Sequence, residues 1–180
     1  MSSSARRSYV DTTFGQIHVT EQGAGPAVLL MHWVPLSGRM YEAELPYFAK
    51  AGRRAIAVDL MGFGRSDRRE GVWSVEQHAD CIITRKGSRR CRQWTARRWF
   101  ASQFSLGSSG FAEKIAAVTA PTLVLTSETE PLRASFEPIT AARGACATHE
   151  FPGDHPLHES KRAGEFAHVV TQLLDLVCHP

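Results

Sequence analysis

The stretch that most constrains the fold is RAIAVDLMGFGRSD, residues 54 to 67, in which an apolar run stops at an aspartate and a glycine-containing loop follows. Consecutive apolar residues over 55 to 58 are typical of a buried strand in a parallel sheet. A second apolar run, Ala27 to Met31, stops at the polar loop HWVPLSG, and a helix is expected over residues 40 to 51. Two strands joined by a helix predict a βαβ unit.

The carboxyl ends of these strands predict where a ligand would bind. Ligands of open parallel sheets bind in the crevice beyond those ends. The loops that begin at His32 and Met61 are therefore expected to face the site.

The rest of the chain extends this α/β pattern. Residues 8 to 14 and 17 to 20 alternate apolar and polar side chains around Gly15 and Gln16, which predicts an antiparallel hairpin. Further elements are expected as a helix from Trp73 with Ser74 as its N-cap, strands over 122 to 126 and 148 to 151, and an amphipathic helix over 163 to 177. The predicted fold class is α/β, a mostly parallel sheet with flanking helices and an N-terminal β-hairpin.

This order of motifs resembles the α/β-hydrolase family. The resemblance is carried by LLMHWVPLSGRMY and AIAVDLMGFGRSD in the region 9 to 80, and by APTLVLTSETEPL and FPGDHPLHES in the region 111 to 177. Trp33 stands where the family usually has glycine. The segment 81 to 110 matches nothing in the family pattern, and the chain of 180 residues is short for it. The resemblance therefore implies a single truncated α/β-hydrolase-like domain over 1 to 180.

The resemblance also implies catalytic roles for matched positions. His155 in FPGDH matches the general base, and Glu130 matches the acid that orients it, with Ser127 in place of a usual glycine. The backbone N–H of Val34 matches an oxyanion donor. The bulky Trp33 has two readings, a cover over a core pocket or a contact to substrate.

A nucleophile is not identified. The sequence contains no G-x-S-x-G, the motif of the family's nucleophile elbow. Ser66 is excluded because Arg68 occupies a position that the crowded elbow reserves for a small residue. Ser108 and Ser109, between a possible strand and a possible helix, are weak candidates, and the alternative is a flexible Gly/Ser linker.

The segment from 81 to 110 is strongly basic. It contains no acidic residue, and its cations are Arg85, Lys86, Arg89, Arg90, Arg92, Arg97 and Arg98. Interleaved Trp94, Trp99 and Phe100 are compatible with phosphate contacts and base stacking, but the pattern favours an exposed linker over nucleic-acid binding. An out-of-frame or recombined junction is one hypothesis for its origin.

Composition and motifs together predict the protein class. The net charge is +3, no apolar run reaches the length of a membrane span, and the N-terminus lacks a signal-peptide core, so a cytoplasmic protein without membrane partners is expected. The cysteine spacings predict reduced, incidental thiols, and we expect no metal and no cofactor. The resemblance implies a small-molecule hydrolase, esterase-like or epoxide-hydrolase-like and catalytically impaired. The alternative is a non-catalytic binding protein whose segment 85 to 98 contacts nucleic acid or another acidic partner.

One expectation concerns the sheet itself. The missing elbow strand would leave a central edge open, and open edges are costly. The strand at 122 to 126 is therefore expected to pair directly with Ala27 to Met31, unless residues 99 to 106 fill the gap.

Overall fold

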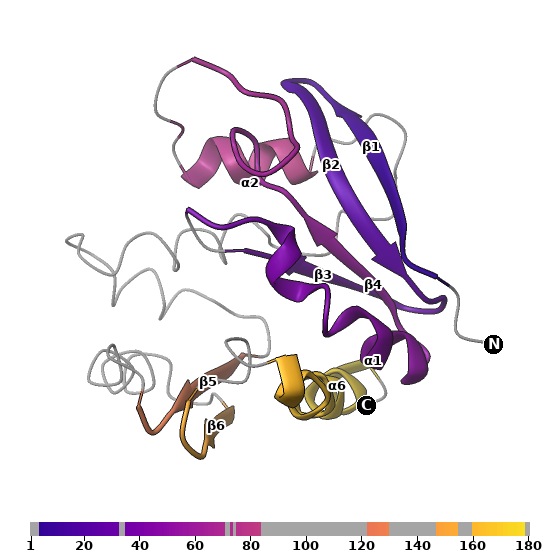
Figure 1. The fold of residues 1–180 in the computed structure, drawn as a ribbon, viewed down its shortest axis with the longest axis vertical. Coiled ribbons are helices and arrows are strands. Elements are labelled where there is room, and N and C mark those ends of the chain that lie inside the picture. Colours follow the sequence, from indigo (N-terminus) through magenta and orange to yellow (C-terminus); the bar gives the residue numbers. More distant parts are fainter. Residues whose placement is uncertain are drawn as a thin grey trace. The chain divides into compact units, whose positions relative to one another are not determined.

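The computed structural model describes residues 4–32, 35–70, 73, 75–83, 122–129, 147–154 and 160–178 (Figure 1). Contacts divide the chain into two compact units, Met1–Arg97 and Arg98–Pro180. The division falls inside the basic segment 81 to 110. The interpretation of 1 to 180 as a single domain stays a prediction.

The first unit is built on a four-stranded sheet with the order β1-β2-β4-β3. Its strands are β1 (Arg6–Thr12), β2 (Gly15–Gln22), β3 (Ala27–Met31) and β4 (Arg54–Val58). β3 and β4 run parallel, from Ala27 opposite Arg54 to Met31 opposite Val58, whereas β2 pairs antiparallel with both β1 and β4. The expected parallel pair and N-terminal hairpin are both confirmed.

The turn of the hairpin lies earlier than expected. It is formed by Thr13 and Phe14, with Thr12 opposite Gly15, so the expectation of a turn at Gly15 and Gln16 was wrong by two residues. The Thr12 hydroxyl fixes this turn, because it donates to the Gly15 carbonyl at 2.7 Å and accepts from the Phe14 N–H at 3.1 Å. Threonine hydroxyls commonly stabilise turns in this way.

The connection between β3 and β4 is shorter in helix than expected. A 3₁₀ turn, η1 (Gly38–Tyr41), precedes the α-helix α1 (Leu45–Lys50), in place of one helix over 40 to 51. Pro46 explains the break, since proline is tolerated only in the first turn of a helix. Leu45 and Phe48 are buried, and α1 contacts β4 and β2.

A second layer of the first unit includes α2 (Val75–Ile83). Cys81 on this helix joins a small buried cluster with Ile17 and Met61, against which Phe14 and Trp73 pack. The expected helix after Trp73 is therefore present, while its proposed N-cap, Ser74, lies outside the described residues.

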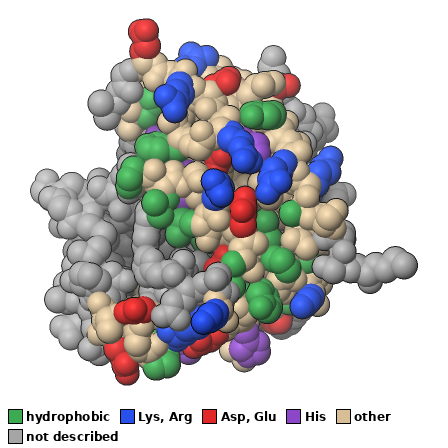
Figure 2. Space-filling model, in the orientation of Figure 1, with side chains coloured by type: hydrophobic (Ala, Val, Ile, Leu, Met, Phe, Trp, Pro, Cys, Tyr) green, Lys and Arg blue, Asp and Glu red, His purple; other side chains and the backbone are tan. Residues whose placement is uncertain are grey.

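The strands β1 and β2 differ in burial. β1 alternates exposed and half-buried residues, whereas every residue of β2 from Ile17 to Gln22 is buried. The buried Glu21 carboxylate accepts from the guanidinium groups of Arg6 and Arg54. Lys and Arg side chains gather over the first unit on the face that Figure 2 shows.

The second unit contains two parallel strands and a long helix. β5 (Leu123–Ser127) pairs in parallel with β6 (Ala147–Phe151), and the 3₁₀ turn η4 (Ser160–Arg162) leads into α6 (Ala163–Cys178). The described strands form two sheets, and the expected direct pairing of residues 122 to 126 with Ala27 to Met31 is not among their strand pairs. The alternative strand at 99 to 106 lies outside the described residues.

Within the described parts of the chain, no helix is both long and apolar enough to span a lipid bilayer.

Candidate active site

None of the residues predicted for catalysis lies within the described segments, and only Val34, Glu130 and His155 directly adjoin one. Val34, Ser108, Ser109, Glu130 and His155 are all outside the described residues. Their proposed roles therefore stay predictions, and the structure bears on them through the segments that lead into these positions.

The loops after β5 and β6 lie side by side. Beyond the last pair of the ladder, Ser127 with Phe151, the Glu128 N–H donates to the Phe151 carbonyl at 3.1 Å. The Thr129 N–H donates to the Gly153 carbonyl at 3.3 Å, and the Gly153 N–H donates to the Glu128 carboxylate at 2.8 Å. The chain segments that lead directly into positions 130 and 155 are therefore joined to each other.

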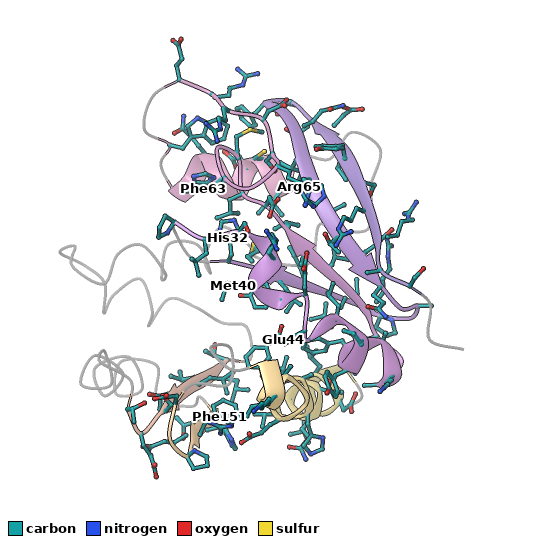
Figure 3. The ribbon with its side chains drawn as sticks, viewed as in Figure 1. His32, Met40, Glu44, Phe63, Arg65 and Phe151 are labelled. Carbon is teal, nitrogen blue, oxygen red and sulfur yellow. The ribbon has the colours of Figure 1, made fainter. Side chains whose placement is uncertain are left out.

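The loop after β3 begins at a buried histidine. His32 is 2 % exposed, and its Nε2 accepts from the Leu60 N–H at 3.0 Å. Its ring meets the Phe63 ring edge-on, with 5.7 Å between centroids (Figure 3). The loop after β3 therefore contacts the loop after β4 through His32, Leu60 and Phe63. These are the two loops that were expected to face a site.

Asp59 organises the loop after β4. Its side chain is 4 % exposed. One carboxylate oxygen, Oδ1, accepts from the Gly38 N–H at 2.7 Å, and the other, Oδ2, accepts from the Arg65 N–H at 2.9 Å and lies 3.1 Å from His18 Nδ1. A buried carboxylate with this many donors is a structural anchor. It joins the loops after β3 and β4 to the hairpin.

Gly64 is required by this anchor. Its φ is +55°, and a Cβ at this position would lie 2.3 Å from Asp59 Oδ2. Gly38 also faces the carboxylate, with 3.1 Å from a Cβ to Oδ1. Gly64, from the loop after β4, and Gly38, from the connection after β3, thus allow the backbone to approach Asp59 closely, in agreement with the structural interpretation of the glycine loop.

Ser66, His18 and Asp59 superficially resemble a catalytic triad. The Ser66 hydroxyl, however, donates to the Asp59 carbonyl at 2.6 Å and accepts from the His18 backbone N–H at 2.8 Å. All three residues are buried. A serine whose hydroxyl contacts backbone groups in this way is not presented to an imidazole as a nucleophile. The trio is structural, and sequence reasoning missed His18 and Asp59 as its members.

A shallow pocket of about 600 Å³ opens beside these loops. It is lined by residues 35 to 37, 39, 40 and 42 and by Gly64, so it lies between the loop after β3 and the loop after β4. The pocket carries both charge signs, from Arg39 and Glu42, and the apolar side chain of Met40. It therefore lies beside the carboxyl ends of β3 and β4, where the sequence predicted a ligand site.

The first unit also buries titratable groups. Burial raises the pKa of Glu44 to about 7; this residue is 1 % exposed, and its Oε2 has no hydrogen-bond partner among the described residues. Burial, followed by the charge of His32, lowers the pKa of His78. Cys81 is free and buried, and burial raises the pKa of its thiol, in line with an unreactive cysteine.

Comparisons with known proteins find relatives among hydrolases. The chain is 52% identical over 50 residues to an epoxide hydrolase from Caballeronia sordidicola, covering 28% of this chain and 15% of that protein. It is 32% identical over 78 residues to a haloalkane dehalogenase from Mycolicibacterium paratuberculosis, covering 41% of this chain and 26% of the relative. The matches therefore span about a quarter or less of these relatives. No protein-family model matches the chain.

A solved structure matches nearly the whole chain. It is a thioesterase domain from the curacin biosynthetic pathway, with a TM-score of 0.72 and 13% identity over 94% of this chain and all of that domain. At this identity the likeness concerns the fold alone.

Proposed function

Because this chain has an α/β-hydrolase fold, we propose that it derives from a small-molecule hydrolase of the epoxide-hydrolase or esterase type and that it is catalytically impaired. The sequence similarity to epoxide hydrolases and haloalkane dehalogenases supports the substrate class, a small organic molecule. A cytoplasmic location remains part of the proposal.

The observation that carries the proposal is the joining of the loops after β5 and β6. In a hydrolase site the base and its orienting acid must meet within hydrogen-bond distance. The hydrogen bonds from Thr129 to Gly153 and from Gly153 to Glu128 join the two loops one and two residues before the proposed acid and base. This arrangement supports Glu130 and His155 as a cooperating pair.

The proposed chemistry follows from these roles. His155 takes the proton of an attacking hydroxyl and later returns it to the leaving group, while Glu130 orients the imidazole and stabilises its cation. The Val34 N–H would stabilise the developing oxyanion. The pocket beside residues 35 to 42 supports a small-molecule ligand next to this loop.

The proposed impairment comes from the missing elbow. Neither Ser108 nor Ser109 stands in G-x-S-x-G, and loss of a triad nucleophile typically costs about a millionfold in turnover. We expect the purified chain to show no measurable hydrolysis of aryl esters or of a terminal epoxide, and no stoichiometric labelling by a fluorophosphonate. Mass spectrometry of the labelled protein would check the second point.

A rebuilt elbow would contradict the impairment. In that case labelling should map to Ser108 or Ser109 and should disappear in His155→Ala. His168→Ala is the matched control, because His168 is an exposed histidine of α6 in the same unit. Labelling that survives in the control and is lost in His155→Ala would establish an active site.

The second candidate is a non-catalytic binding protein. It is favoured by one observation, the seven cations within residues 85 to 98 with no acidic residue among them. Retention of single-stranded DNA that falls steeply with salt, and that is lost when these cations become alanine, would favour this function over the first.

A further inference from the structure

Arg162 contacts the turn that leads into His155. We propose that Arg162 is a positioning residue for His155, holding the turn at 152 to 154 so that the imidazole is presented in one orientation. The inference rests on the proposed function, since it takes His155 as the base.

The guanidinium binds the backbone of the turn directly. Arg162 Nη1 donates to the Pro152 carbonyl at 2.8 Å and to the Asp154 carbonyl at 2.5 Å. The two carbonyls belong to residues on either side of Gly153, whose φ is +67°. A single group that binds both carbonyls fixes the bend between them, directly before position 155.

The guanidinium is itself held in place. Glu165 accepts from its other edge in a bidentate pair, Nε to Oε2 at 2.8 Å and Nη2 to Oε1 at 3.1 Å, and this hydrogen bonding lowers the pKa of Glu165. The Arg162 side chain is 19% exposed, and its Cζ lies 6.0 Å from the centroid of the buried Phe151 ring. A lysine cannot reproduce this planar fork.

The opposite side of the turn is held by the loop after β5. Glu128 accepts from the Gly153 N–H, and the Thr129 hydroxyl donates to the Asp154 carboxylate. The turn is therefore fixed between that loop and the start of α6. A general base needs a fixed ring orientation, so contacts that fix its preceding residue contribute to its function.

The test measures the turn and the imidazole without requiring turnover. Isotope-labelled full-length protein is compared with Arg162→Gln, Arg162→Lys and the control Lys161→Gln, which removes the neighbouring exposed cation. Amide exchange of Gly153 and Asp154 and the titration of the His155 ring are followed by NMR. Unchanged exchange in the middle of α6 verifies that each variant is folded.

The sign of the pKa change separates positioning from charge. The proposed pairing with Glu130 implies a His155 pKa above the ordinary value for histidine, and loss of positioning should lower the pKa toward that ordinary value. If Arg162 acted only through its positive charge, its removal would raise the His155 pKa, because a nearby cation disfavours the protonated imidazole. We expect Arg162→Gln and Arg162→Lys to lower the His155 pKa and to speed exchange at Gly153 about tenfold, whereas Lys161→Gln does neither.

Two results would overturn the inference. One is a His155 pKa that is unchanged or raised in Arg162→Gln, and the other is an equal response in Lys161→Gln. Failure of the proposed function is a separate result, because it would show as an ordinary His155 pKa already in the parent protein, before any substitution.

Discussion

The loop after β4 and the turn after β6 both follow a strand of a parallel pair, but they are stabilised in opposite ways. The loop after β4 is held by Asp59, a buried carboxylate that contacts three segments. The turn after β6 is held by Arg162, whose hydrogen bonds to the backbone of the turn are exposed to solvent. Buried polar networks are costly to break, whereas exposed ones are screened by water. The two regions should therefore respond very differently to single substitutions.

The largest effect is expected for Asp59→Ala. The substitution leaves the Gly38 N–H, the Arg65 N–H and His18 Nδ1 without their acceptor in a buried site. The free energy of unfolding should fall by about 3–5 kcal/mol. Urea unfolding followed by circular dichroism measures it.

Asp67→Ala is the control in the same loop. Asp67 is exposed and accepts from the Gln16 N–H, so its loss should cost about 1 kcal/mol. Equal costs for the two substitutions would remove the distinction between an internal anchor and a surface contact.

Gly64 in the loop after β4 and Gly153 in the turn after β6 have similar positive φ angles, so alanine substitutions at these two positions allow a direct comparison of the two regions. Gly64→Ala forces a Cβ against the Asp59 carboxylate, and we expect a loss of roughly 2–4 kcal/mol. Gly153→Ala has the same left-handed backbone, but no described residue lies within 4 Å of the Cβ, so only backbone strain of about 1 kcal/mol is expected. Thermal unfolding of both variants gives the comparison, and Gly62→Ala, also without neighbours, should behave like Gly153→Ala.

A gain in stability, in place of a loss, is expected for Glu44→Gln. The folded-state pKa of about 7 exceeds the ordinary value of 4.5, so the carboxyl destabilises the fold as pH rises from about 4.5 to 7. Glutamine removes this cost. The variant should be about 1–3 kcal/mol more stable above pH 7 and equal to the parent below pH 4.5, as measured by urea unfolding across pH.

Glu165→Gln should show the opposite sign. The pKa of Glu165 is lowered by Arg162, so its contribution is present above the ordinary pKa of 4.5 and is lost as pH falls through the lowered value. A stability gain at neutral pH in this variant would contradict the assignment of Arg162 and Glu165 as a favourable pair.

The sequence predicted strands better than connections. The strands expected over 27 to 31, 55 to 58, 122 to 126 and 148 to 151 lie within one residue of β3, β4, β5 and β6. Apolar runs bounded by polar residues identify buried strands well. The helix at 40 to 51 was overestimated because the effect of Pro46 was not weighed, and the turn was misplaced because a Thr12 side-chain contact decided it.

For the candidate site, the sequence indicated the candidate catalytic residues but not the residues that hold the neighbouring loops in place. Resemblance selected Glu130 and His155, and their roles stay predictions. Arg162 was missed because its contacts with the turn depend on the fold at η4, which no residue pattern indicates. Asp59 had a usable signal, an aspartate at a strand end followed five residues later by glycine, which was read only as a turn.

The hydrogen bonds around Asp59 also have a consequence for protein synthesis. Its partners, from His18 to Ser66, are all made before the basic segment is translated. Nascent chains fold from the N-terminus as soon as a unit has its contacts. The hydrogen bonds that close the hairpin, β3 and β4 around Asp59 can therefore form without any residue of the basic segment.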